Sequence, residues 1–317
     1  MLCLACGEPL LTKVPYARAM KILTTKSGEN VPLVGLGTFP LQGERLADVV
    51  VSAYGCGYRL FDTADDYRGE AGIGMAIERL AARGVRRESL FIQTKISDNH
   101  AFPDEPLMGV YFNPNSAFMR RHSVAEVVRE KVSISLRKMN TDYLDSLLIH
   151  FPYPHYYVEI WREMIKLKAE GSVRYIGVSN FSERHIDKLI DETGVCPDIN
   201  EMYLSPLGTK ESRVKYCLDH DIRIMAYSPL MDLVNRRLPQ EPFTSLARKY
   251  GKSVTQIILR WNIERGCMPL PKTQSAMRLK ENVDVMDFSL SKDEVALINA
   301  LNVDYQYLVE SNYCPGL

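Results

Sequence analysis

Four ionisable residues, Asp62, Tyr67, Lys95 and His150, each stand at or just past the end of a short apolar segment typical of a β-strand. A phenol with its ordinary pKa of about 10 is a poor proton donor near neutral pH. A cationic lysine in contact with it favours the phenolate and is expected to lower that pKa by about one to three units. We therefore assign Tyr67 as a general acid, tuned by Lys95 and Asp62, with His150 hydrogen-bonded to the oxygen that Tyr67 protonates. Such a site polarises and protonates a carbonyl, while a cofactor must supply the hydride.

Each of these residues also has an ordinary structural interpretation. Lys95 and Asp62 could form an ion pair inside a barrel, and a histidine such as His150 often serves only packing at a strand end. A lone tyrosine such as Tyr67 commonly fills a core or surface position. The occurrence of all four at strand ends favours the chemical interpretation.

The segments that carry them belong to a series of eight strand-like stretches rich in Val, Ile, Leu and Tyr. They are continuous apolar runs rather than alternating ones, as expected for parallel strands buried on both faces. The predicted strands are residues 33–39, 59–64, 90–96, 145–151, 173–180, 198–204, 222–228 and 267–273.

The segments between the strands carry signals of helix starts and ends. Ser123, Ser253 and Ser291 each precede a Glu or Gln by three residues, the pattern of a capping box, and Gly171 is placed to end a helix. Strict alternation of eight strands and eight helices predicts a closed (β/α)8 TIM barrel, in which the carboxyl ends of the strands meet at one mouth. The competing open doubly wound sheet is disfavoured because the turn at residues 35–38 lacks the third glycine of a dinucleotide fingerprint.

Two connections are much longer than the usual βα loop. Residues 97–123 and 229–241 both follow the carboxyl end of a strand, so both are expected to lie over the mouth and to influence substrate choice. The aromatic-rich tail, residues 301–317, is a candidate for a third wall. Residues 20–317 are predicted to form a single barrel domain, and residues 1–19 an extension of unknown role.

Composition excludes several other functions. The chain has 317 residues, 46% apolar and 25% charged, and its 39 basic and 39 acidic residues give no net charge that would favour nucleic acid or a membrane surface. No apolar run approaches the ~20 residues that span a bilayer. The seven scattered cysteines are typical of free thiols in a reducing cytoplasm, and the pair Cys3 and Cys6 lacks the second pair that a structural zinc needs. We expect a cytoplasmic monomer or weak oligomer, without a metal.

Several blocks, taken in order, resemble those of the aldo-keto reductases, from residue 31 to about residue 290. They are GLGTF (35–39), FDTADDYRGE (61–70), TK (94–95), LIHFP (148–152), IGVSNF (176–181), AYSPL (226–230) and LPKTQSAMRLKEN (270–282). The resemblance implies a (β/α)8 barrel with Asp62, Tyr67, Lys95 and His150 as its catalytic residues and a nicotinamide as hydride donor. It also implies reduction of a small carbonyl compound to an alcohol.

The same blocks imply the cofactor positions. Ser179 and Asn180 match the pair that holds the carboxamide, and Tyr227 matches the ring that stacks on the nicotinamide. Two cations around one phosphate make charge-assisted hydrogen bonds that NADH could not use, so the match at the 2′-phosphate implies NADPH/NADP+. The phosphate positions are Lys272, Thr273 and Arg278; the other implied cofactor contacts are Gly37, Thr38, Asp62, Glu201, Ser228, Leu230, Glu281 and Asn282.

The chain departs from the family pattern at a few positions. Glu201 stands where the family usually has Gln, and a carboxylate cannot donate to the carboxamide carbonyl. As a hypothesis, its charge would favour the cationic oxidised cofactor and alcohol oxidation. Phe39 and Phe151 stand where Trp is common, which predicts a substrate pocket formed by Phe39, Tyr67, His150 and Phe151 with smaller aromatic walls. His150, where relatives that reduce steroid carbon–carbon double bonds have Glu, favours carbonyl reduction.

Two alternative functions remain at the level of sequence. The first is an NADPH-binding regulatory or redox-sensing subunit that keeps the fold but turns over slowly. The second is a barrel isomerase or hydrolase that uses His150 and Asp62, which would leave residues 270–282 unexplained. NADPH binding would exclude the isomerase or hydrolase. Turnover of a carbonyl substrate would distinguish a reductase from the regulatory subunit.

Overall fold

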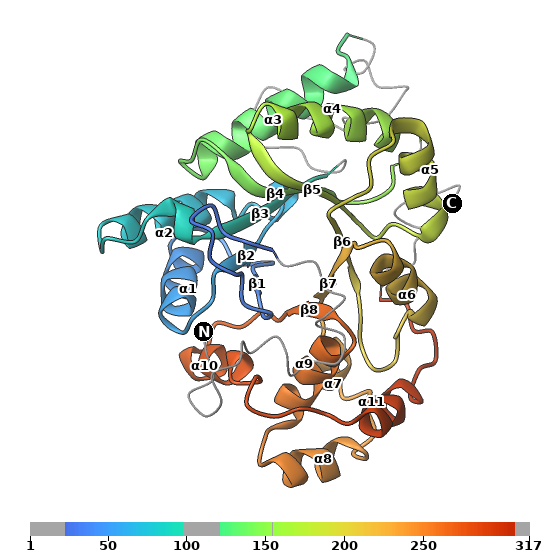
Figure 1. Ribbon diagram of the computed structural model, residues 1–317. Coiled ribbons are helices and arrows are strands. Elements are labelled where there is room, and N and C mark those ends of the chain that lie inside the picture. The colour runs from blue at the N-terminus through green and yellow to red at the C-terminus, as the bar shows by residue number, and fades with distance from the viewer. Residues whose placement is uncertain (1–22, 98–120, 154, 308–317) are drawn as a thin grey trace.

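Eight parallel strands form one sheet whose order in space is the order in sequence. The computed structural model describes residues 23–97, 121–153 and 155–307, and Figure 1 shows the strands at the centre with helices around them. The strands are β1 (Leu36–Gly37), β2 (Leu60–Asp62), β3 (Phe91–Ile96), β4 (Leu144–Ile149), β5 (Val173–Ser179), β6 (Ile199–Tyr203), β7 (Arg223–Tyr227) and β8 (Cys267–Leu270). The predicted (β/α)8 barrel is confirmed.

The first and last strands are joined by hydrogen bonds in which the amides on the β1 side donate to carbonyls on the β8 side. The amide of Gly35 donates to the carbonyl of Pro269 (3.1 Å), and the amide of Gly37 donates to that of Pro271 (3.2 Å). Neither proline has a backbone N–H that could donate a hydrogen bond back to the first strand. This explains why β1 is two residues long where residues 33–39 were predicted, and why β8 ends at Leu270 rather than at residue 273.

The helices lie outside the strands, and three of them occupy the connection between β7 and β8, where one was predicted. The capping boxes predicted at Ser123, Ser253 and Ser291 are present, and Gly171 follows the end of its helix with φ 84°. The helices are α1 (Gly43–Gly55), α2 (Glu70–Ala81), α3 (Val124–Lys138), α4 (Tyr157–Ala169), α5 (Glu183–Thr193), α6 (Glu211–Asp219), α7 (Met231–Val234), α8 (Phe243–Tyr250), α9 (Val254–Glu264), α10 (Ala276–Val283) and α11 (Lys292–Asn299).

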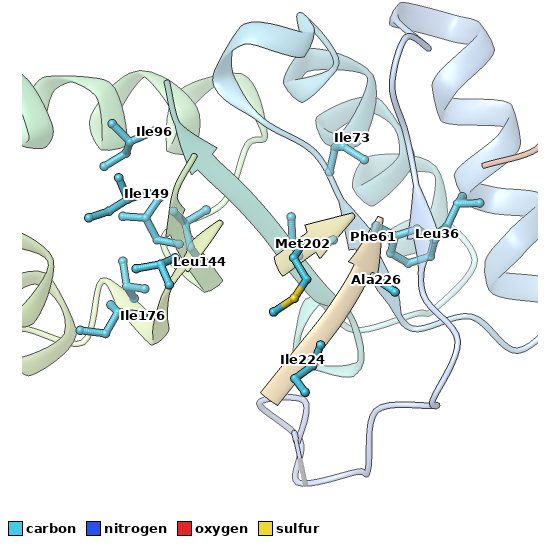
Figure 2. Close-up of a cluster of buried hydrophobic side chains, with 14 of the residues drawn as sticks. Leu36, Phe61, Ile73, Ile96, Leu144, Ile149, Ile176, Met202, Ile224 and Ala226 are labelled. Carbon is cyan, nitrogen blue, oxygen red and sulfur yellow. The ribbon is translucent and has the colours of Figure 1, made fainter. Parts of the chain in front are cut away.

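Apolar side chains form two layers, because successive residues of a strand point to opposite faces. The outer layer packs the strands against the helices and includes Phe61, Ile96, Ile149 and Ile224, which are labelled in Figure 2. Full burial of such a side chain stabilises the fold by about 1.5–3 kcal/mol. The inner layer fills the interior of the barrel and consists of Leu23, Val31, Leu60, Phe91, Leu148, Ile199, Met225, Met268 and Leu270.

Five of the predicted catalytic and cofactor residues lie on the inner face, nearer the carboxyl ends. Each is two or four residues after an inner-layer side chain of its own strand, so strand alternation points both into the barrel. The pairs are Leu60 and Asp62, Phe91 and Lys95, Leu148 and His150, Ile199 and Glu201, and Met225 and Tyr227. The apolar inner layer is thus a floor beneath a polar mouth.

A short hairpin lies at the amino end of the barrel. An antiparallel bridge joins Thr24 and Asn30, and Leu23 and Val31 pack into the inner apolar layer. Residues 1–19 and most of the predicted long connection at 97–123 lie outside the described residues. None of the helices in the described ranges has the length and apolarity needed to cross a bilayer.

Candidate active site

A buried ion pair lies at the centre of the mouth. Lys95 Nζ on β3 donates to Asp62 Oδ1 on the neighbouring β2 at 2.5 Å and to the carbonyl of Thr63 at 3.1 Å. Both side chains are almost inaccessible to solvent. Burial alone lowers the pKa of Lys95, but the carboxyls of Asp62 and Glu201 outweigh burial and raise it well above its ordinary value. Lys95 is therefore a permanent ammonium group.

Tyr67 lies over this ammonium group. A 3-10 turn, Asp65–Tyr67, follows β2 and places the Tyr67 ring with its centroid 5.1 Å from Lys95 Nζ. The ring of Phe39 lies 5.0 Å away and that of His150 5.6 Å away, centroid to centroid. The four predicted catalytic residues are therefore brought together from β2, β3, β4 and the turn.

Lys95 lowers the pKa of Tyr67, as predicted, but burial has a larger effect that the sequence did not reveal. Burial raises the pKa of Tyr67 above its ordinary value and outweighs the opposing effect of Lys95. The carboxyls of Asp62, Glu201 and Asp66 add to the increase. Lys95 acts in the predicted direction, and without it the phenol would be a still weaker acid.

The imidazole of His150 is held by residues that the sequence argument missed. Ser97 Oγ lies 2.6 Å from His150 Nδ1, and Asp66 Oδ1 lies 3.5 Å from the same nitrogen. A hydroxyl that donates to Nδ1 leaves the proton on Nε2, where it can be given to a carbonyl oxygen. Phe151 stacks on the other side of His150 with ring centroids 4.8 Å apart. Ser97 directly follows the strand predicted at residues 90–96, and Asp66 lies two residues after the strand predicted at 59–64. Their positions at strand ends could therefore have indicated them.

The carboxyl of Asp66 also has a pKa that differs from its ordinary value. Burial and then the neighbouring Asp65 raise its pKa to about 7. The neighbouring Asp65 carboxylate accepts from Lys131 Nζ at 2.7 Å and from the amide of Ser97 at 3.1 Å. Asp66 can therefore change charge beside His150 near neutral pH.

Glu201 belongs to the same buried cluster as Lys95 and Asp62. Its Oε1 lies 3.3 Å from Lys95 Nζ, and its Oε2 accepts from Gln93 Nε2 at 2.7 Å. Gln93 Nε2 also donates to Asp62 Oδ1 at 2.9 Å. Burial and then Asp62 raise the pKa of Glu201 to about 8, so the fixed negative charge expected from sequence is disfavoured at neutral pH. Gln93 was missed, although it lies two residues before Lys95 on the same strand face.

A second group of predicted residues lies at the ends of β5 and β7. The Tyr227 hydroxyl donates to Asn180 Oδ1 at 2.9 Å, and Asn180 Nδ2 donates to Ser179 Oγ at 3.1 Å and to the His150 carbonyl at 3.2 Å. The Asn180 amide donates to the Glu201 carbonyl at 2.8 Å. This network holds the amide of Asn180 and the ring of Tyr227 side by side, next to the catalytic cluster.

A third group follows β8. Lys272 and Arg278 are exposed, and neither forms an ion pair with another described residue. Thr273 is buried, and Ser275 caps the amino end of α10, where unpaired amides favour an anion. A Cβ added to Gly37 would lie 2.9 Å from the carbonyl of Leu270, so only glycine lets β1 approach this segment. Thr38 donates its hydroxyl to the Asp62 carbonyl at 2.8 Å and joins this group to the cluster.

The remaining predicted cofactor residues have partners of their own. Glu281 accepts the hydroxyl of Ser253, and Asn282 is buried beside Tyr58. Ser228 adopts φ 49° after β7, and Leu230 precedes α7. These side chains position the backbone around the mouth.

A small cavity opens between the second group and the described part of the carboxyl-terminal tail. Tyr203, which the sequence argument did not assign, has its ring 6.0 Å from Tyr227 and 5.7 Å from Tyr307, and its hydroxyl donates to the buried Asp232 at 3.1 Å. It lies two residues after Glu201 on the same strand face. The lining residues are Phe151, Asn180, Tyr203, Lys210, Tyr227, Gln306 and Tyr307. Among the described residues, no cluster of three or more His, Cys, Asp or Glu is arranged to hold a metal ion.

The fold and this set of side chains define a barrel oxidoreductase, and the comparisons agree. Residues 33–303 match the model of the Aldo/keto reductase family. The chain is 36% identical over 284 residues to "Methylglyoxal reductase DkgA" of Escherichia coli O157:H7, covering 89% of this chain and 93% of that protein. It is 34% identical over 279 residues to "Glyoxal reductase" of Bacillus subtilis, covering 88% and 91%.

Solved structures give the same result. The crystal structure of Bombyx mori aldo-keto reductase AKR2E4, in complex with NADP, is 33% identical to this chain with a TM-score of 0.77, and the match covers 93% of this chain and 96% of that one. The chain belongs to the aldo/keto reductase family and is an oxidoreductase.

Proposed function

We propose that this chain is an NADPH-dependent reductase of small aldehydes and ketones, with Tyr67 as the general acid. The observation that carries the proposal is the Lys95–Asp62 ion pair at 2.5 Å beneath the Tyr67 ring, with His150 beside that ring. An ammonium group in this position stabilises the phenolate that remains after Tyr67 has given up its proton.

His150 has a separate role in this proposal. With Ser97 at Nδ1, its Nε2 proton is directed toward the carbonyl oxygen that Tyr67 protonates. Two donors on one oxygen polarise the carbonyl and fix its orientation. Phe39 and Phe151, whose rings lie against Tyr67 and His150, supply apolar walls beside the reacting oxygen.

The residues present fit NADP(H), which supplies the hydride when bound. Tyr227 has its hydroxyl committed to Asn180 and is free to present its ring face, while Ser179 and Asn180 offer polar atoms to a carboxamide. Lys272 and Arg278, which form no ion pair within the described part of the chain, lie near the capped amino end of α10 and suit a 2′-phosphate.

Two observations bear on the substrate class: the aromatic side chains at the mouth of the barrel and the names of two relatives. The aromatic rings of Phe39 and Phe151 flank the proposed proton donors Tyr67 and His150, which suits a compact carbonyl compound. Two relatives carry the names methylglyoxal reductase and glyoxal reductase. We therefore infer α-dicarbonyls and reactive aldehydes as substrates of this chain.

The proposal is tested by following NADPH oxidation with methylglyoxal, glyoxal and aromatic aldehydes for the natural protein and for Tyr67→Phe. General acid catalysis contributes about 10²–10⁴-fold, so turnover should fall by at least about a hundredfold while NADPH binding persists. Tyr54→Phe, which removes a phenol on α1 outside the site, is the matched control and should keep full turnover.

The other outcomes have distinct meanings. Tight NADPH binding without turnover by the natural protein would favour a regulatory or redox-sensing subunit. Full activity of Tyr67→Phe would show that another group donates the proton. Failure to bind NADPH would contradict the whole proposal.

A further inference from the structure

The buried cluster at the centre of the mouth contains one more acid than base. Asp62 and Glu201 both contact the single ammonium of Lys95, at 2.5 Å and 3.3 Å. The amide nitrogen of Gln93 bridges the same two carboxyls at 2.9 Å and 2.7 Å, but an amide adds no charge. The four side chains are at most 3% exposed.

Charge balance in this cluster depends on one proton. With both acids ionised, the cluster carries an excess negative charge in a region from which water is excluded, and this is costly. With Glu201 protonated, Asp62 and Lys95 balance each other. Glu201 is the acid that gives up its charge more readily, because it lies farther from the ammonium than Asp62 does. Its raised pKa, about 8, agrees with this charge count.

Glu201 also faces the groups assigned to the nicotinamide. It pairs with Ser179 in the register of β5 and β6, its carbonyl accepts the amide of Asn180, and it contributes to the raised pKa of Tyr227. The ionisable groups around it are Asp62, Lys95, Tyr67 and Tyr227. The oxidised nicotinamide ring carries a positive charge, whereas the reduced ring carries none.

We propose that Glu201 is a proton-linked sensor of the cofactor's oxidation state: it holds a proton beside NADPH and releases it when NADP+ occupies the site. This inference rests on the proposed function. In both states the sum of charges over Asp62, Lys95, Glu201 and the ring is zero. The step is a simple ionisation, in which the carboxylic acid of Glu201 becomes a carboxylate and its proton passes to the buffer.

The sign of the pH dependence follows by linkage. A bound cation stabilises the carboxylate of Glu201 and lowers its pKa below the value of about 8 in the protein without ligands. Between the two pKa values NADP+ binding releases a proton, so the affinity for NADP+ relative to NADPH rises with pH, by up to about tenfold per pH unit. Above about pH 8 Glu201 is already ionised and the ratio becomes constant.

The experiment is isothermal titration calorimetry at pH 7 in buffers with different ionisation enthalpies, with NADP+ and NADPH as ligands. The natural protein should release up to one proton more with NADP+ than with NADPH. The 2′-phosphate, with its own pKa near 6, is present in both ligands and cancels in the difference. This comparison needs no variant, so equal proton release with the two ligands would overturn the inference.

Two variants assign the proton. Glu201→Gln should bind both cofactors but show no difference in proton release, and its NADP+ to NADPH affinity ratio should not vary with pH. Asp66→Asn, which removes the other acid that titrates near pH 7 in the mouth, should keep the difference. A difference that survives in Glu201→Gln would overturn the inference. If neither cofactor binds the natural protein, the proposed function itself fails.

Discussion

Ser97 Oγ lies 2.6 Å from His150 Nδ1, so the hydroxyl that follows β3 is hydrogen-bonded to the imidazole that follows β4. Both side chains are buried. Because Ser97 does not itself face the proposed carbonyl, it is a positioning residue.

Replacing Ser97 with Ala should lower kcat about tenfold, which corresponds to roughly 1.4 kcal/mol in activation free energy. The reason is that His150 loses the partner that keeps its proton on Nε2. NADPH affinity should be unchanged, and Ser97→Thr, which retains a hydroxyl, should recover much of the loss. The check is steady-state kinetics together with NADPH titration, and equal losses in Ser97→Ala and Ser97→Thr would contradict the positioning role.

Replacing Lys272 or Arg278 with Ala should weaken NADPH binding by about tenfold or more each and leave NADH binding nearly unchanged. Each cation is expected to make a charge-assisted hydrogen bond, worth about 1.5–3 kcal/mol, to the 2′-phosphate. The measurement is fluorescence titration with both cofactors. Lys280→Ala removes an exposed charge from the same helix, α10, and serves as the control. Equal weakening by all three substitutions would indicate a general electrostatic effect instead.

Glu70 should make the protein less stable as pH rises through 7. Burial and then Asp65 raise its pKa to about 7, while its carboxyl accepts the hydroxyl of Thr94 at 2.8 Å. The folded state favours the protonated acid, so the stabilising contribution is complete below the ordinary pKa of the acid and is lost as pH rises through the folded-state value. The loss is on the order of 3 kcal/mol at most.

Denaturant unfolding at pH 5 and pH 9 tests this expectation. Glu70→Gln should show a smaller decrease in the free energy of unfolding between the two pH values than the natural protein does. Glu159→Gln, at an exposed position on α4, should behave like the natural protein. An unchanged decrease in Glu70→Gln would show that this carboxyl is not the one that titrates.

Tyr203→Phe should destabilise the protein by about 1–3 kcal/mol, because it leaves the buried carboxylate of Asp232 without its 3.1 Å donor. Arg237 Nη1, at 3.9 Å from the same oxygen, compensates only in part. A double-mutant cycle with Asp232→Asn measures the coupling between the two side chains. A coupling energy near zero would mean that the contact does not hold α7 to the end of β6.

The sequence predicted the barrel, its strand order and the assembly of Asp62, Tyr67, Lys95 and His150. These features follow from strand periodicity, helix caps and short blocks at strand ends, all of which are local. The short extent of β1 could not be read from its apolar residues, because it depends on one proline in β8 and one just after it, more than two hundred residues away.

The errors at the site have a common physical origin. The lowering of the Tyr67 pKa was inferred from the neighbouring charge of Lys95, and the charge of Glu201 from its residue type, whereas burial has the largest effect on the pKa of both groups. The extent of burial depends on how strands from the whole chain close around the mouth. Ser97, Gln93 and Tyr203 could have been found, because each lies at or near a strand end or shares a strand face with a predicted site residue.

The apolar inner layer has a kinetic consequence. Leu60, Phe91, Leu148 and Met225 separate the acid cluster from the amino end of the barrel, and the hairpin residue Leu23 packs among them. Protons therefore exchange with solvent through the mouth, on the side where the cofactor is proposed to bind. The proton that Glu201 is proposed to release therefore leaves on the cofactor's side of the barrel, and its exit should be slower while a cofactor is bound than in the free protein.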